Sequence, residues 1–200
     1  DLLAAIPSVV FGLWGYVLLI PLLGQTVFPW MTQHIGFIPY LGGSPGSGYG
    51  LLTTAIVLAF MIVPLISATM REGISAIEPS LKEAGLGLGL NRLEVLWNII
   101  LPKLKTTLVG VSILALGRAL GETMAVVMVS GNALNYLPNN IYTPISTMAA
   151  FIVSQLERAL QDPTNMAVEA LAEIALVLLL LTVIVNIIAR MILWGAKVRS

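Results

Sequence analysis

The chain has 200 residues, of which 58% are hydrophobic and only 10% are charged, and its ten acidic and ten basic residues cancel to a formal net charge of zero. A soluble domain has about 25% charged residues, and a nucleic-acid-binding protein carries a basic surface, so the composition fits neither class. No charged residue occurs between positions 2 and 70, and such a stretch cannot form a solvated surface. The sequence therefore predicts an integral membrane protein that contacts membrane lipid and no nucleic acid.

Cysteine is absent, and His34 is the only histidine. This composition excludes a disulfide framework, a cysteine-based metal site or nucleophile, and a histidine cluster. The sequence begins at Asp1 rather than methionine, and it lacks the basic region and the cleavage site of a signal peptide. We therefore expect an N-terminal truncation, with at least one upstream element missing.

Four apolar stretches are long enough to cross a hydrocarbon core, which takes about 20 residues of helix. They are residues 2–23, 49–70, 107–130 and 167–194. A fifth apolar stretch, residues 144–160, is too short to span easily and is expected to form an interfacial or re-entrant helix. The prediction is an all-α fold, a polytopic transmembrane helical bundle with four spans, forming one domain over residues 1–200.

Lysine and arginine are distributed unevenly between the two sides of this bundle. Five of them lie in residues 71–105 and three near the C-terminal end, whereas the opposite side has only Arg158. Short loops rich in Lys and Arg stay on the cytoplasmic side. The sequence therefore predicts that residues 71–106 form a cytoplasmic loop, that the C-terminus is cytoplasmic, and that residues 24–48 and 131–165 are external.

The cytoplasmic loop carries signals for two short helices. Pro79 suits the first turn of a helix, and Gly89 is typical of a helix end. Asn91 and Glu94 have the spacing of a capping box, which predicts the start of a second helix, and we expect that helix to end near Pro102. An ordinary cytosolic hairpin explains the same pattern.

Part of this loop resembles the EAA loop of ABC-importer permeases. The matching positions are Glu83, Ala84, Gly89 and residues 99–102 (IILP), and only Gly85 departs from the motif, where alanine is usual. The resemblance implies that the first short helix docks on an ATPase subunit through Glu83, Ala84, Gly85 and Gly89. It also implies that partner subunits bind and hydrolyse ATP, so that this chain is a transport subunit without catalytic residues, cofactor or metal.

Arg118 and Glu122 are the only charged residues between positions 106 and 156. Four residues apart, they are expected to share a helix face near the middle of the third span, where charge is costly unless it faces protein or water. Two interpretations remain open. The pair is a structural ion pair that locks two helices, or it forms an anion site on a translocation path, because the planar guanidinium fork binds oxyanions bidentately.

Residues 116–126 (LGRALGETMAV) and 6–15 (IPSVVFGLWG) resemble phosphate permeases of the PstC type. Sulfate and molybdate permeases share the fold, the EAA loop and an Arg-Ala-x-Gly-Glu segment, and the following Thr-Met-Ala-Val favours phosphate. The resemblance implies a type I ABC importer permease fold in the cytoplasmic (inner) membrane of a prokaryote. It also implies a phosphate pathway that includes Arg118, Glu122 and Thr123.

The same resemblance implies three kinds of protein partner: a homologous second permease subunit, an ABC ATPase dimer, and an extracytoplasmic phosphate-binding protein. The expected function is ATP-driven import of inorganic phosphate by alternating access. An ion-coupled secondary transporter with Glu122 as proton carrier is an alternative, but it needs no ATPase contact, and the EAA match argues against it. A structural membrane subunit without a pathway is a further alternative.

Overall fold

The computed structural model describes residues 6–134 and 137–197, with side chains described up to residue 191. Asp1 and Arg199 therefore lie outside the described residues. Among the described residues, four helices are long and apolar enough to cross a membrane, Ser8–Ile35, Leu51–Ser75, Arg92–Leu120 and Met166–Met191. The predicted all-α bundle with four spans is confirmed, but the bounds of the first and third spans differ from the prediction. The first helix continues to Ile35, so residues 24–35 are helical and do not belong to the loop predicted over residues 24–48.

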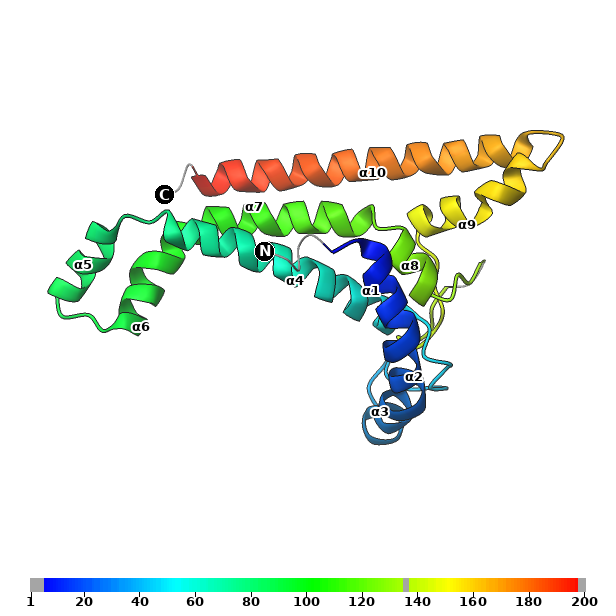
Figure 1. Cartoon of the computed structure of the whole chain (residues 1–200), viewed down its shortest axis with the longest axis horizontal. Helices are drawn as coiled ribbons and strands as arrows, with labels where there is room; N and C mark the ends of the chain where they lie inside the picture. Colours follow the sequence, from blue (N-terminus) through cyan, green and yellow to red (C-terminus); the bar gives the residue numbers. More distant parts are fainter. Residues whose placement is uncertain (1–5, 135–136, 198–200) are drawn as a thin grey trace.

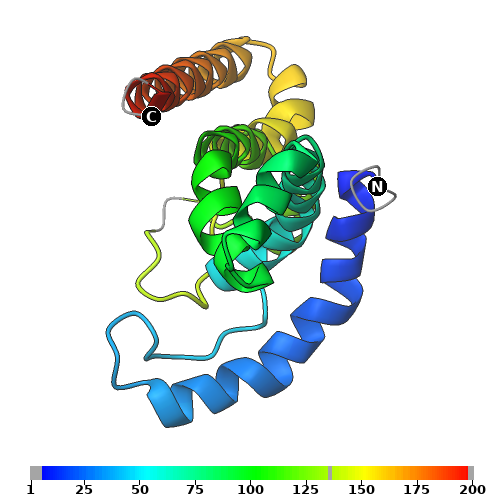
Figure 2. The ribbon, with the colours of Figure 1, turned by 90° about the vertical axis from the view of Figure 1, so that its left-hand side faces the viewer.

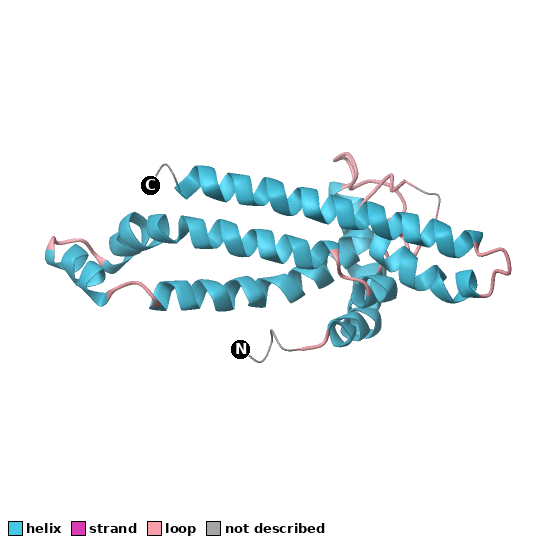
Figure 3. Ribbon diagram, turned by 90° about the horizontal axis from the view of Figure 1, so that it is seen from above, coloured by secondary structure: helices cyan, strands magenta, loops and turns pink. Residues whose placement is uncertain are grey.

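Three long helices lie side by side along the long axis of the molecule (Figures 1 and 3). These are α4 (Leu51–Ser75), α7 (Leu101–Leu120) and α10 (Met166–Lys197). At one end lie α5 (Pro79–Gly87) and α6 (Arg92–Val95), and at the other α8 (Met124–Val129) and α9 (Met148–Leu160). Here α5, α6 and its continuation η4 (Leu96–Ile100) are called the coupling hairpin. The opposite end, which contains α8, α9 and the described residues of the loops 36–50 and 130–147, is called the loop end.

The first span is a single curved helix that runs along one side of this bundle (Figure 2). It consists of α1 (Ser8–Trp14), η2 (Gly15–Leu19), α2 (Ile20–Leu22), η3 (Leu23–Val27) and α3 (Phe28–Ile35). Glycines let it approach its neighbours: a Cβ atom on Gly12 would lie 2.9 Å from Ala125 Cα, and one on Gly15 would lie 2.8 Å from Val57 Cγ2. The first helix is therefore held against α8 and α4 by backbone proximity.

Each of the three π-helical segments ends two residues before a proline. The residues immediately before Pro21, Pro29 and Pro102 donate their N–H groups to carbonyls five residues back. Proline has no N–H, and its ring crowds the carbonyl four residues before it. Widening the helix by one residue relieves this crowding and lets the helix continue. Our expectation that the second short helix ends near Pro102 is therefore wrong, because η4 (Leu96–Ile100) joins α6 to α7.

The third span begins at Arg92 and ends at Leu120, whereas the hydropathy predicted residues 107–130. The chain leaves the helix at Gly121 and begins the separate helix α8 at Met124. Local hydrogen bonds support this break, because the Thr123 hydroxyl donates to the Gly121 carbonyl at 3.0 Å. Side chains that bond the nearby backbone compete with helical hydrogen bonds, and this competition is invisible to an average of hydropathy.

The loop end joins two loops that are distant in sequence. The N–H groups of Leu51 and Leu52 at the start of α4 donate to the carbonyls of Thr143 and Ile141, at 3.1 and 2.9 Å. These are N–H groups that a helix start leaves without intrahelical partners. The Ile141 N–H also donates to the Tyr40 carbonyl at 3.1 Å, so the loop before α4 and the loop before α9 form one hydrogen-bonded unit. The helix expected within residues 144–160 is present as α9, which has 13 residues and is too short to span.

Candidate functional site

Arg118 lies in the last turn of α7, and its side chain is exposed in the isolated chain. It lines a groove of about 410 Å³ between α4, α7 and α10. The other lining residues are Leu65, Leu114, Gly117 and Asn186. This site is called the Arg118 groove below.

The Arg118 groove lies beside the middle parts of α4 and α10, two of the helices that are long and apolar enough to cross a membrane. Leu65 of α4 and Asn186 of α10 are each at least ten residues from both ends of their helices. Among the described residues, no side chain or backbone group accepts a hydrogen bond from the Arg118 guanidinium. A cation at this depth is stable only where protein, water or a ligand faces it, so the groove presents an unsatisfied positive charge.

Glu122 does not share a helix face with Arg118, contrary to the prediction from their spacing. Arg118 belongs to α7, whereas Glu122 lies in the turn between α7 and α8. Its Oε1 accepts a hydrogen bond from the N–H of Ala125 at 3.4 Å, which caps the start of α8. These two described residues form no ion pair with one another, so an ion pair between them does not lock the helices.

Thr123 also lies in this turn, and neither Thr123 nor Glu122 is among the residues that line the groove. The structure therefore brings only Arg118 of the three predicted pathway residues to the groove. Asn186 is a groove residue that the sequence reasoning missed. The available signal was its amide within the otherwise apolar run of residues 174–189, in which Thr182 is the only other polar side chain.

The coupling hairpin contains the positions of the EAA motif. Glu83 and Ala84 are exposed on α5, and Gly89 is exposed with φ +86° just after the helix. Gly89 N–H donates to the Leu86 carbonyl at 3.0 Å, and the next N–H donates to the Gly85 carbonyl at 3.2 Å. This is the Schellman pattern that a glycine in the left-handed region permits, so the predicted helix end is confirmed.

Gly85 faces the interior of the hairpin instead of its outer surface. It is buried, and a Cβ atom built on it would lie 2.6 Å from Ile99 Cδ1 and 3.1 Å from Val95 Cγ2. The glycine thus lets α5 pack closely on α6 and η4. Its assignment to a docking surface is corrected, since only Glu83, Ala84 and Gly89 of the four coupling residues are exposed.

The capping box that starts α6 is also confirmed. Glu94 N–H donates to Asn91 Oδ1 at 2.9 Å, and Asn91 N–H donates to Glu94 Oε2 at 2.7 Å. Beyond it, the hairpin exposes large apolar side chains, with Leu88 83%, Leu93 67% and Trp97 66% exposed. Apolar surface of this kind marks a protein interface or a membrane contact.

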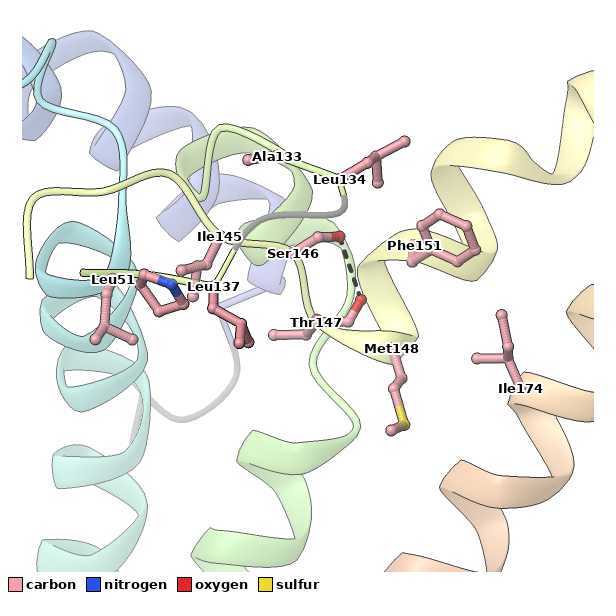
Figure 4. A pocket seen from close by; sticks show the side chains of 11 residues that line it. Leu51, Ala133, Leu134, Leu137, Ile145, Ser146, Thr147, Met148, Phe151 and Ile174 are labelled. Carbon is pink, nitrogen blue, oxygen red and sulfur yellow. Dashed lines mark hydrogen bonds between the residues drawn. The ribbon is translucent and has the colours of Figure 1, made fainter. Parts of the chain in front are cut away.

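A second groove, of about 790 Å³, lies at the loop end between the loop before α9, α9 itself and α10 (Figure 4). Leu134, Leu137 and Phe151 contribute to its mostly apolar walls. No charged side chain lines it among the described residues. It offers nothing that neutralises an anion, so the Arg118 groove is the candidate site for one.

The chain matches the family described as binding-protein-dependent transport system inner membrane component over residues 1–193. It belongs to that family. The chain is therefore an inner-membrane component of a transport system, which agrees with its four apolar helices.

Curated relatives carry more specific names. The chain is 44% identical over 193 residues to phosphate transport system permease protein PstC 1 of Mycobacterium tuberculosis, covering 95% of this chain and 57% of the relative. It is 39% identical over 196 residues to PstC of Pasteurella multocida, covering 96% and 60%. It is 34% identical over 188 residues to a probable PstC of Methanocaldococcus jannaschii, covering 94% and 58%. The chain thus spans about three fifths of the length of these relatives, and no solved structure matches it.

Proposed function

We propose that this chain is the permease subunit of an ATP-driven importer that carries inorganic phosphate across the inner membrane of a prokaryote. The observation that carries the proposal is Arg118, an exposed guanidinium without a partner among the described residues, in a groove beside the middle parts of two helices that are long and apolar enough to cross a membrane. The names of the relatives, which are phosphate transport system permeases, support phosphate as the anion.

The chemistry of the groove suits transient anion binding. The guanidinium offers parallel N–H donors to two oxygens of a phosphate. Leu65 and Leu114 form apolar walls, and a low local dielectric strengthens the attraction between opposite charges. A single arginine gives one strong contact, which permits release on the cytoplasmic side.

Glu122 and Thr123 have a different role in this proposal. They hold the turn at which α7 ends, through the contacts of Glu122 with Ala125 and of Thr123 with Gly121. This turn lies immediately after Arg118 and so fixes where its helix stops. We propose that both residues position the pathway residue instead of contacting phosphate.

The proposed partners are a homologous second permease, an ABC ATPase dimer that binds the ATP, and an external phosphate-binding protein. The coupling hairpin and the C-terminal end of α10 lie at the same end of the bundle (Figure 1). Because Lys and Arg concentrate there, we propose that this end and the C-terminus are cytoplasmic. The exposed Glu83, Ala84 and Leu88 then face the ATPase, whereas the loop end faces the binding protein.

The continuous third helix provides a mechanical link between ATPase and substrate. α5 packs on α6 and η4 through Gly85, and the helix then continues from Arg92 to Leu120 without interruption. A displacement of α5 is therefore carried along one helix to Arg118. We propose that this movement opens the Arg118 groove alternately to the two sides of the membrane.

The test uses the assembled full-length complex with its ATPase and binding protein in lipid vesicles. Arg118→Lys keeps the charge but loses the fork, so we expect phosphate uptake to fall at least about tenfold. Arg190→Lys is the matched control, because Arg190 is exposed on α10 and does not line the groove. We expect unlabelled phosphate to compete for uptake, and sulfate and molybdate to compete poorly.

Three outcomes contradict this proposal. Unchanged uptake by Arg118→Lys contradicts bidentate recognition at this residue. Equal competition by sulfate contradicts phosphate as the specific substrate. Uptake that persists without ATP and follows a proton gradient identifies a secondary transporter instead.

A further inference from the structure

Asn186 is the one amide side chain in the apolar run of α10, and its orientation is determined by a hydrogen bond. Its Nδ2 donates to the carbonyl of Thr182 at 2.8 Å. Because a carbonyl only accepts hydrogen bonds, the atom nearest to it is the amide nitrogen. Asn186 Oδ1 is therefore left as a free acceptor, and no described residue donates to it.

Gly117 lies beside this acceptor in the Arg118 groove. A Cβ atom built on Gly117 would lie 4.0 Å from Asn186 Oδ1, an ordinary van der Waals distance, so α7 and α10 approach closely here. Arg118, the next residue on α7, lines the same groove together with Asn186. A donor group and an acceptor group thus reach one cavity from two different helices.

An acceptor beside an arginine distinguishes between oxyanions. Near neutral pH phosphate retains at least one O–H group, whereas sulfate and molybdate have none. A guanidinium donates to the ionised oxygens of any of these anions. An amide oxygen accepts the phosphate O–H but repels the bare oxygen of sulfate, and a site built to bond a hydroxyl rejects an analogue that lacks it.

We infer that Asn186 is a specificity-determining residue of the phosphate path, whose Oδ1 accepts the hydrogen bond of the protonated phosphate oxygen while Arg118 binds the ionised ones. This inference rests on the proposed function of the groove. It also explains an amide oxygen without a donor at this depth, which is costly in an apolar membrane.

The test compares wild type with Asn186→Leu and Thr182→Val in the full complex in vesicles. Leucine has a similar size but no acceptor. Thr182→Val removes the other polar side chain of the same apolar run, whose hydroxyl donates to the Leu179 carbonyl at 2.8 Å, and Thr182 does not line the groove. Thr182→Val therefore controls for a general loss of polarity on α10.

The readout is inhibition of phosphate uptake by anions added at the cytoplasmic side, which bypasses the selectivity of the binding protein. The probes are phosphate and monofluorophosphate, a dianion of similar shape with fluorine in place of the hydroxyl. In wild type and Thr182→Val we expect phosphate to inhibit at about tenfold lower concentration, the usual scale for one hydrogen bond. In Asn186→Leu we expect the two inhibitory concentrations to become equal.

The outcomes separate the two claims. If Asn186→Leu keeps the tenfold preference, if Thr182→Val loses it as well, or if wild type shows no preference while it still takes up phosphate, the role of Asn186 is overturned and the phosphate path stands. If wild type takes up no phosphate, the proposed function itself fails.

Discussion

The two ends of the bundle differ in how much of a buried core they contain. At the loop end, Tyr142 is only 1% exposed and Phe28 is fully buried, with ring centroids 4.7 Å apart, and the Tyr142 hydroxyl donates to the Leu41 carbonyl at 3.0 Å. At the coupling hairpin, a small core around Val95 and Leu104 leaves large apolar side chains exposed. The loop end therefore has a large core closed by its own loops and the hairpin a small one, although both ends expose apolar side chains, such as Leu137 (86%) and Leu88 (83%).

This difference indicates which end of the chain resists displacement and which end a partner subunit can move. At the loop end, backbone hydrogen bonds join the loop before α9 to the start of α4 and to the loop before α4, so this end resists displacement. The coupling hairpin is joined to the bundle by the continuous helix from Arg92 to Leu120 and by the short link from α4, whose Ile77 packs in the hairpin core. A partner that binds the hairpin therefore moves that helix relative to the loop end.

Removing the Tyr142 side chain should cause the largest loss of stability, and the loss should arise at the loop end. Tyr142→Ala leaves a cavity against Phe28 and removes the bond to Leu41, and we expect it to lower the free energy of unfolding by about 3–5 kcal/mol. Thermal unfolding of the purified complex measures the change. The control Tyr40→Ala changes a side chain that is 70% exposed and should leave the unfolding temperature nearly unchanged. Equal losses in the two variants contradict a closed loop end.

Filling the space at Gly85 should have an intermediate effect, confined to the coupling hairpin. Gly85→Val overlaps Ile99, and we expect a loss of about 1–3 kcal/mol in local stability. Protection of the hairpin from hydrogen exchange and co-purification of the ATPase measure the effect, and both should decrease. Gly87→Ala is the matched control, since no atom lies within 4 Å of its Cβ position. A hairpin that tolerates both changes equally is not held through Gly85.

The smallest expected effect concerns the turn between α9 and α10. The N–H of Thr164 at 3.0 Å, its hydroxyl at 2.7 Å and the N–H of Ala167 at 3.2 Å hold the pKa of Asp162 below its ordinary value of 3.8. A lowered pKa in the folded state means that the carboxylate stabilises the turn above pH 3.8 and ceases to do so as the pH falls through the lowered value.

Hydrogen exchange of this turn as a function of pH tests the prediction. We expect wild-type protection, corrected for intrinsic exchange, to stay constant above about pH 5 and to decline in acid. Asp162→Asn should show weaker protection and no such decline. A pH-independent turn in the wild type rules out the role of the carboxylate.

Several local features were predictable because they depend on neighbours in the sequence. The capping box of Asn91 and Glu94 and the helix end at Gly89 are set by spacing and backbone conformation, and both are present. The position of the third span was not predictable in the same way. The average hydropathy placed Gly121 and Glu122 inside the span. The backbone leaves the helix there because side chains in the turn bond to nearby backbone groups.

The sequence by itself determined that this chain is a four-span helical membrane component, because apolar length and the exclusion of charge from lipid allow little else. It also singled out the pair of Arg118 and Glu122, since charged residues in an apolar run are conspicuous. Only the tertiary structure decided what Arg118 faces. Packing of α10 on α7 sets Asn186 beside Gly117, and the end of α7 separates Glu122 from Arg118. Neighbours across two helices depend on packing distances that no spacing along the chain specifies.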